Sequence, residues 1–144
     1  MIVSQMLKSK PEMGVISVKP DATVIEASKL LSQHRIGTVV VSQDGKSLDG
    51  ILSERDIVRE LGKRGPSCLN DPVKALMTAE LVTCTPTNTA LEVLEMMTTG
   101  RFRHLPVMDN GDMLGLISIG DAVKGRLAQL AMEKASLEGM IMGH

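Results

Sequence analysis

The chain has 144 residues, 43% of them hydrophobic, and 16 basic side chains against 17 acidic ones give a formal net charge of −1. This balance leaves no basic surface for nucleic acid and no polybasic segment for an anionic membrane. Phe102 is the only aromatic residue, which excludes a base-stacking platform, and no apolar run approaches the ~18 residues of a membrane span.

The first fourteen residues, MIVSQMLKSKPEMG, lack the long apolar core of a signal peptide. The two cysteines, Cys68 and Cys84, are too few for a disulfide framework. These features predict a soluble cytoplasmic protein with reduced thiols.

The sequence is an internal duplication. Many residues recur after 66 positions, and after 65 positions beyond one shorter turn. The identical pairs are Pro20/Pro86, Thr23/Thr89, Glu26/Glu92, Arg35/Arg101, Val41/Val107, Gly45/Gly111, Gly50/Gly115, Ser53/Ser118, Asp56/Asp121 and Val58/Val123.

In the first copy, residues 15–18 are expected to form a short strand that ends before Pro20. The pattern Thr23-x-x-Glu26 is a capping box that predicts a helix. Its apolar face is expected to contain Val24, Ala27, Leu30 and Leu31. Strands are then predicted at 38–41 and 50–52, joined by a turn at Asp44-Gly45, and the second of them leads directly into a helix that starts at Ser53.

The second copy repeats this order. A strand is predicted at 81–84, a helix after the capping box Thr89-x-x-Glu92, strands at 104–108 and 115–117, and a helix from Ser118. The apolar face of the capped helix is expected to contain Ala90, Val93, Leu94 and Met97. The predicted organisation is a first domain at 1–61, a connector at 62–72, a second domain at 73–127, and a C-terminal helix and tail at 128–144.

Leu127, Leu130, Ala131, Leu137 and Ile141 share roughly one face of the last segment. This face is expected to dock on its own domain, with a second subunit as the alternative. The fold class is α/β (mixed α+β), each repeat having a small three-stranded sheet with two helices. Because a half of ~60 residues buries too little surface to be robust alone, we expect the halves to pack about a pseudo-twofold axis that creates two related clefts.

The heptapeptides GILSERD (50–56) and GLISIGD (115–121) share a Ser-x-x-Asp pattern at a strand-to-helix junction. One interpretation is a capping-box variant that satisfies free N–H groups at the helix start. The other is a ribonucleotide site: the Asp accepts hydrogen bonds from a ribose diol and the helix N-terminus favours phosphate. The two interpretations are compatible, and the sequence leaves both open.

This duplicated motif resembles the cystathionine β-synthase (CBS) domain pair, or Bateman module. The stretches RIGTVVVSQDGKSLDGILSERDIV (35–58) and RFRHLPVMDNGDMLGLISIGD (101–121) are similar to the cores of CBS repeats. The resemblance covers roughly residues 3–127. Within the family, the chain is similar to the small stand-alone members found in prokaryotes.

The resemblance implies an adenine nucleotide as ligand: AMP, ADP, ATP or NADH. Asp56 and Asp121 correspond to the ribose-binding residues, and Ser53 and Ser118 to positions near ribose and phosphate. The residues that correspond to the base site are Ile16, Ser17, Val82 and Thr83, with Ile51 and Leu116 as walls.

The positions that contact phosphate in this family correspond to Arg103 and His104 in this chain. These two residues are expected to bind the phosphates of the nucleotide held by Asp56. The first copy departs from the pattern, because Gly37 and Thr38 replace that pair, so the two clefts should differ. Arg55, and behind it Arg59 and Lys124, are weaker phosphate candidates.

The function implied is a regulatory module without catalytic activity that signals nucleotide occupancy to a partner protein, in a homodimer. The alternatives are an enzyme acting on a nucleotide and a purely structural dimerisation unit. No zinc-ligand spacing and no motif for a nucleophile supports an enzyme.

Overall fold

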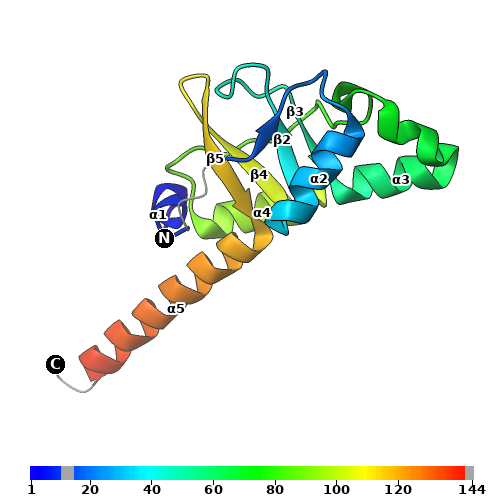
Figure 1. Cartoon of the computed structure of the whole chain (residues 1–144). Coiled ribbons are helices and arrows are strands. Elements are labelled where there is room, and N and C mark those ends of the chain that lie inside the picture. The colour runs from blue at the N-terminus through cyan, green and yellow to red at the C-terminus, as the bar shows by residue number, and fades with distance from the viewer. Residues whose placement is uncertain (11–14, 142–144) are drawn as a thin grey trace. The chain divides into compact units, whose positions relative to one another are not determined.

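The structure is a computed structural model that describes residues 1–10 and 15–141 (Figure 1). Residues 11–14 of the expected first domain and 142–144 of the expected tail therefore lie outside the described residues. In chain order the elements are α1 (Val3–Lys8), β1 (Ser17–Val18), α2 (Val24–His34), β2 (Thr38–Val41), β3 (Gly50–Ser53), α3 (Glu54–Arg64), the 3-10 helices η1 (Pro66–Asn70) and η2 (Val73–Ala75), α4 (Ala90–Gly100), β4 (His104–Asp109), β5 (Asp112–Ser118) and α5 (Ile119–Ile141).

The chain forms two compact units, and neither is one continuous stretch of sequence. The first-repeat unit contains the described part of Met13–Leu81 together with Asn110–Leu114. The second-repeat unit contains the described parts of Met1–Glu12 and Gly115–His144, together with Val82–Asp109. The limits of these units differ from the domain limits expected from the sequence. The expected limits remain a proposal for where each repeat begins and ends.

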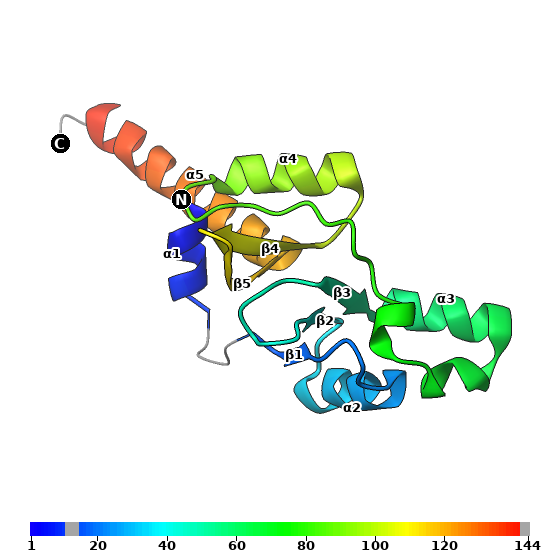
Figure 2. The same ribbon diagram turned by 90° about the horizontal axis from the view of Figure 1, so that it is seen from above.

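A three-stranded sheet in the order β1-β2-β3 forms the centre of the first-repeat unit (Figure 2). Strand β2 is parallel to β1 and antiparallel to β3, with Val40 opposite both Ser17 and Ile51. All four residues of β2 are buried, as a central strand of a sheet with a covered face requires. The apolar face of α2 closes this core with Val24, Ala27 and Leu31 buried and Leu30 partly buried.

The capping boxes confirm both predicted helix starts. Thr23 Oγ1 accepts a hydrogen bond from the Glu26 N–H of α2 at 3.2 Å. In α4 the exchange is reciprocal: Thr89 Oγ1 accepts from the Glu92 N–H at 3.1 Å, and Glu92 Oε1 accepts from the Thr89 N–H at 2.9 Å. By donating this hydrogen bond to the carboxylate, the Thr89 N–H lowers the pKa of the Glu92 carboxyl.

The second-repeat unit departs from the expected three strands. Only β4 and β5 form a sheet, and the strand expected at 81–84 is reduced to one parallel bridge between Cys84 and Val107. Cys84 donates its N–H to Pro106 O and accepts from the Met108 N–H, both at 2.9 Å. Cys84 is buried whereas its neighbours Val82 and Thr83 are exposed, so one inward side chain is all that this segment contributes to the core.

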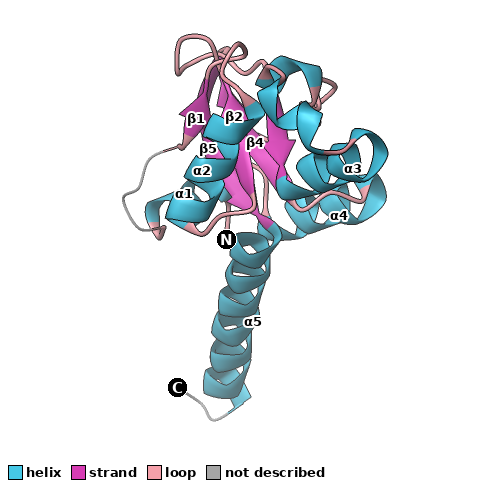
Figure 3. Ribbon diagram, turned by 45° about the vertical axis from the view of Figure 1, so that its right-hand side comes forward, coloured by secondary structure: helices cyan, strands magenta, loops and turns pink. Residues whose placement is uncertain are grey.

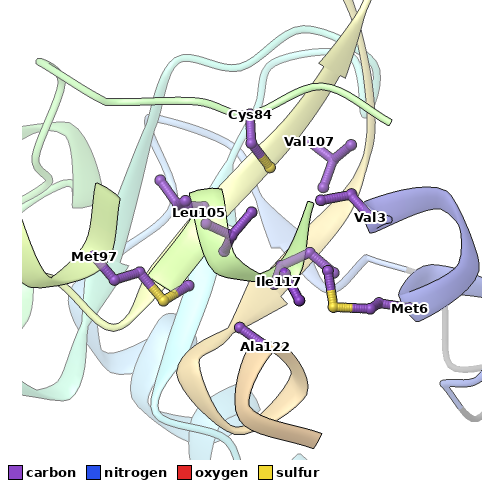
Figure 4. Close-up of a cluster of buried hydrophobic side chains, with 10 residues drawn as sticks. Val3, Met6, Cys84, Met97, Leu105, Val107, Ile117 and Ala122 are labelled. Atoms are coloured by element: carbon purple, nitrogen blue, oxygen red, sulfur yellow. The ribbon is translucent and has the colours of Figure 1, made fainter. Parts of the chain in front are cut away.

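The two units exchange their leading segments. Helix α1 precedes the first repeat in the sequence, yet Val3 and Met6 lie buried in the second-repeat core beside Leu105 and Ile117 (Figure 4). Conversely, η2 precedes the second repeat, yet Val73 is buried in the first-repeat core. Each core is therefore completed by a segment that the sequence places next to the other repeat.

The connector expected at 62–72 is largely helical and lies within the first-repeat unit. Helix α3 continues to Arg64, and η1 follows after Gly65, whose φ of 77° is one that L-residues rarely adopt. Cys68 in η1 is fully buried. Arg64 anchors the segment by donating to Glu60 at 2.8 Å and to Asp71 Oδ2 at 2.6 Å.

The C-terminal segment corrects one expectation. Helix α5 is one continuous helix from Ile119 to Ile141 (Figure 3), and it runs through the proposed domain limit at 127/128. Its apolar residues do not dock on their own unit: Leu127, Leu137 and Ile141 are 61%, 59% and 84% exposed. The reason is that only the first turns of α5, through Ala122 and Gly125, face the core.

Among the residues that the structure describes, no helix combines the length and apolarity that a membrane crossing would need.

Candidate ligand-binding site

The first Ser–Asp pair, Ser53 and Asp56, lies where β3 ends and α3 begins. Ser53 Oγ accepts from the Asp56 N–H at 3.2 Å, and Asp56 Oδ2 accepts from the Ser53 N–H at 2.9 Å. The capping interpretation of this motif is therefore confirmed. Asp56 is only 7% exposed. Its second oxygen, Oδ1, has a single long contact of 3.4 Å with the largely exposed Arg59 side chain.

The second Ser–Asp pair, Ser118 and Asp121, repeats this geometry where β5 meets α5. The Asp121 N–H donates to Ser118 Oγ at 3.1 Å, and Asp121 Oδ2 accepts from the Ser118 N–H at 2.9 Å. One partner is different: Lys10 Nζ lies 2.8 Å from the same Oδ2 and also donates to Leu116 O at 2.8 Å.

Lys10 changes the electrostatics of the second pair. Partial burial of Asp121 would by itself raise the pKa of its carboxyl, but the Lys10 ammonium and the Ser118 N–H together hold that pKa below its ordinary value. The carboxylate is thus ionised at neutral pH. Each carboxylate can accept about four hydrogen bonds, and in the described part of the chain the contacts of Asp121 all fall on Oδ2. Its Oδ1 can accept from a ligand.

Each pair lies beside the residues that precede the central strand of its own unit. Glu54, the first residue of α3, donates its N–H to Gly37 O at 2.9 Å. Ile119, the first residue of α5, donates equivalently to Arg103 O at 2.8 Å. The structure thus brings Gly37 and Thr38 to the first Ser–Asp pair, where Thr38 also pairs with Ser53 across the sheet. It brings Arg103 and His104 to the second.

The remaining predicted residues differ in their position and exposure. Ile51 and Leu116 precede the Ser by two residues in β3 and β5 and are half-buried. Val82 and Thr83 are exposed. Ser17 lines an open hollow of about 510 Å³ with Lys19 and the turn at 42–45, and Gly37 lines another of about 530 Å³ with Arg35 and Glu54; neither hollow includes Asp56. Ile16 O accepts from the Val40 N–H at 3.1 Å, and Arg55 is exposed on α3.

Lys10 is the residue that the sequence reasoning missed. Its signal is a second spacing: Val3, Met6 and Leu7 recur as Val73, Leu76 and Met77 after 70 residues. In that alignment Lys10 corresponds to Glu80, so the segment that brings a cation to Asp121 has an acidic residue in its other copy. The two Ser–Asp pairs therefore differ in local charge as well as in their preceding residues.

The described residues hold no group of three or more His, Cys, Asp or Glu side chains that could bind a metal ion. Cys68 and Cys84 are both free and buried. Burial raises the pKa of the Cys84 thiol to about 11, which leaves it protonated and a poor nucleophile at neutral pH.

Comparison with known proteins agrees with this arrangement. The family model described as "CBS domain" matches residues 7–63 and 73–127. The chain is 35% identical over 148 residues to the CBS domain-containing protein CBSX3, mitochondrial, of Arabidopsis thaliana, covering 98% of this chain and 72% of that protein.

Two solved structures extend the likeness. A CBS-domain containing protein from Agrobacterium tumefaciens is 40% identical with a TM-score of 0.82, over 88% of this chain and 99% of that one. A CBS domain protein from Pyrobaculum aerophilum, solved in complex with AMP, is 26% identical with a TM-score of 0.73, over 84% and 89% of the respective chains.

Proposed function

The chain belongs to the CBS domain family and carries a pair of these domains, and from this premise we propose that it is a regulatory module that binds adenine nucleotides and does not catalyse their conversion. The observation that carries the proposal is the doubled Ser–Asp pair. In each, the helix cap fixes a carboxylate at a helix N-terminus and leaves one oxygen able to accept from a ribose diol.

The ligand class is supported by a structural relative. The Pyrobaculum aerophilum protein was solved with AMP, so AMP is the first candidate here, followed by ADP, ATP and NADH. Asp56 and Asp121 would each accept from one ribose. Ser53, Ser118, Ile16, Ser17, Ile51, Leu116, Val82 and Thr83 would border ribose and base.

Arg103 and His104 would bind the phosphate groups, and Arg55 would contribute more weakly. Gly37 and Thr38, at the equivalent positions of the first repeat, have no positive charge. We further propose that occupancy is signalled to a partner protein from a homodimer in the cytoplasm. A ligand can shift such a module only by the difference in its affinity for two states.

Isothermal titration calorimetry with AMP and with ATP tests the proposal. Wild type should bind nucleotide, Asp56→Asn and Asp121→Asn should each lose one binding event, and the double variant should lose both. Thr89→Ala is the matched control, because it removes a helix cap of the same kind on α4, where no Asp is proposed to bind ligand. It should keep the wild-type stoichiometry.

Two outcomes would contradict the proposal. If the Asn variants lower the melting temperature but leave nucleotide affinity unchanged, capping is the whole function of the motif and the chain is a structural unit. If the bound nucleotide is converted to product, as followed by chromatography, the chain is an enzyme. Binding that raises the melting temperature without turnover supports the proposal.

A further inference from the structure

Helix α5 carries a stripe of apolar residues that remain exposed in their own unit. The stripe consists of Val123, Leu127, Leu130, Leu137 and Ile141, which are 42%, 61%, 43%, 59% and 84% exposed. Their spacings of four, three, seven and four residues follow a heptad, with Lys134 at the one position between Leu130 and Leu137 that is not apolar. Such a repeat keeps one seam of a helix facing a partner helix.

The stripe points away from the face that α5 uses inside its unit. Gly125 faces α1, because a Cβ there would lie 2.7 Å from Met6 Sδ, and Gln129 accepts from the Met1 amine at 2.6 Å. At about 100° per residue, Gly125 lies on the side of the helix opposite the stripe, and Gln129 about 120° from it. Packing within the unit therefore does not account for the apolar residues of the stripe.

Charges beside the stripe identify the partner and its direction. The first half of the exposed helix has Lys124 and Arg126 on its flanks, and the second half has Glu133 and Glu138. Two copies in parallel would place Glu133 of each against Glu138 of the other, whereas antiparallel copies place Lys124 opposite Glu138. Opposite charges at such flanking positions set partner and orientation.

Lys134 fits the same arrangement. Its ammonium lies 3.9 Å from Glu138 Oε1, so the alkyl stem can pack in the seam while the charge stays at the edge. A single polar residue at a core heptad position fixes register at a cost in stability. We propose that α5 pairs in antiparallel orientation with α5 of a second copy of this chain, a surface that is independent of nucleotide binding.

Analytical ultracentrifugation of the full chain tests the surface. Leu130→Glu/Leu137→Glu should weaken self-association at least 100-fold, because each variant helix places carboxylates in the seam. Met132→Glu/Ser136→Glu is the matched control: it adds the same charge on the opposite side of the same helix and should leave association unchanged. Circular dichroism should find both variants folded, since Leu130 and Leu137 are not part of the core.

Disulfide cross-linking tests the direction. The double variant Lys124→Cys/Glu138→Cys should form a covalent dimer under mild oxidation, and each single variant should not; the native cysteines are buried and do not interfere. Cross-linking by the single variants would indicate parallel pairing and overturn the proposal. So would a monomeric wild type at 100 µM, or equal association of the two double-Glu variants.

Discussion

At the scale of single residues, the Ser-x-x-Asp motif acts first on its own backbone. The N–H groups of Ser53 and Asp56 are both satisfied within the motif, as are those of Ser118 and Asp121. These bonds also hold each carboxylate in one orientation, which is the preorganisation that a diol-binding group needs. The cap and the proposed ligand site are thus one arrangement, and only a binding measurement separates the two functions.

Lys10 is expected to determine how the second pair responds to pH. Asp121 has a folded pKa below the unfolded value of about 3.9, so its ion pair stabilises the fold above that value and is lost as the pH falls through the folded pKa. Lys10→Met removes the cation, and burial then raises the pKa of Asp121. Urea unfolding between pH 3 and 7 should find a loss of about 0.5–1 kcal/mol at pH 7 and an acid transition that begins at higher pH.

Lys8→Met is the control for this substitution. Lys8 is exposed, and among the described residues it forms no ion pair, so the same change two residues earlier should leave the acid transition where it is in wild type. Equal pH profiles for the two Met variants would mean that Lys10 does not act on Asp121.

At the scale of elements, two equivalent glycines meet different neighbours. A Cβ at Gly50 of β3 would lie 2.7 Å from both Met77 Sδ and the Thr78 backbone carbonyl, whereas one at Gly115 of β5 would lie 2.7 Å from Leu7 Cδ2 alone. A side-chain tip can rotate away, but a carbonyl bonded to Ile51 cannot. Urea denaturation should therefore find a loss of about 1–3 kcal/mol for Gly50→Ala and a smaller loss for Gly115→Ala.

Gly62→Ala, in the last turn of α3, provides the reference for both, because beyond its own helical turn no atom lies within 4 Å of the added Cβ. It should stabilise by about 0.5–1 kcal/mol, through helix propensity and a less flexible unfolded chain. A greater loss for Gly115→Ala than for Gly50→Ala would contradict the packing described for β3.

The elements that the sequence predicted best are those with a local cause. Capping residues located the starts of α2 and α4 to the residue and apolar periodicity identified their buried faces, and Gly45 and Gly111 marked the turns, where φ is 81° and 83°. The prediction of a strand at 81–84 was wrong, because strand pairing there depends on how many side chains of this segment the core can bury. Similarly, periodicity found the stripe on α5 but could not tell whether its own unit covers it.

At the scale of the whole molecule, local sequence patterns do not predict the exchange of leading segments. Residues 1–61 and 73–127 look like complete repeats, yet Val3 and Met6 complete the second-repeat core and Val73 and Leu76 the first. Nothing in the composition of α1 or η2 specifies which core receives it. The trace of the exchange in the sequence is a difference in spacing, 70 residues for these segments against 66 and then 65 for the rest.

The exchange makes a crossed prediction for Met6 and Leu76, which are equivalent in the 70-residue spacing and are 2% and 9% exposed. Truncating a buried Met or Leu to Ala costs about 2–5 kcal/mol, because the cavity only partly collapses. Local protection should fall in the unit that loses the side chain. In hydrogen-exchange mass spectrometry, Met6→Ala should therefore lower protection in α4, β4 and α5, far along the chain from the substitution.

Leu76→Ala should do the reverse and lower protection in β2, β3 and α2, although it lies at the start of the second repeat. Each variant serves as the control for the other, since the two differ only in which core they weaken. Loss of protection confined to the repeat that follows each substitution in sequence would mean that the leading segments are not exchanged. The crossed pattern would instead make each repeat depend on the other end of the chain, because neither core is complete without the segment that the other repeat carries.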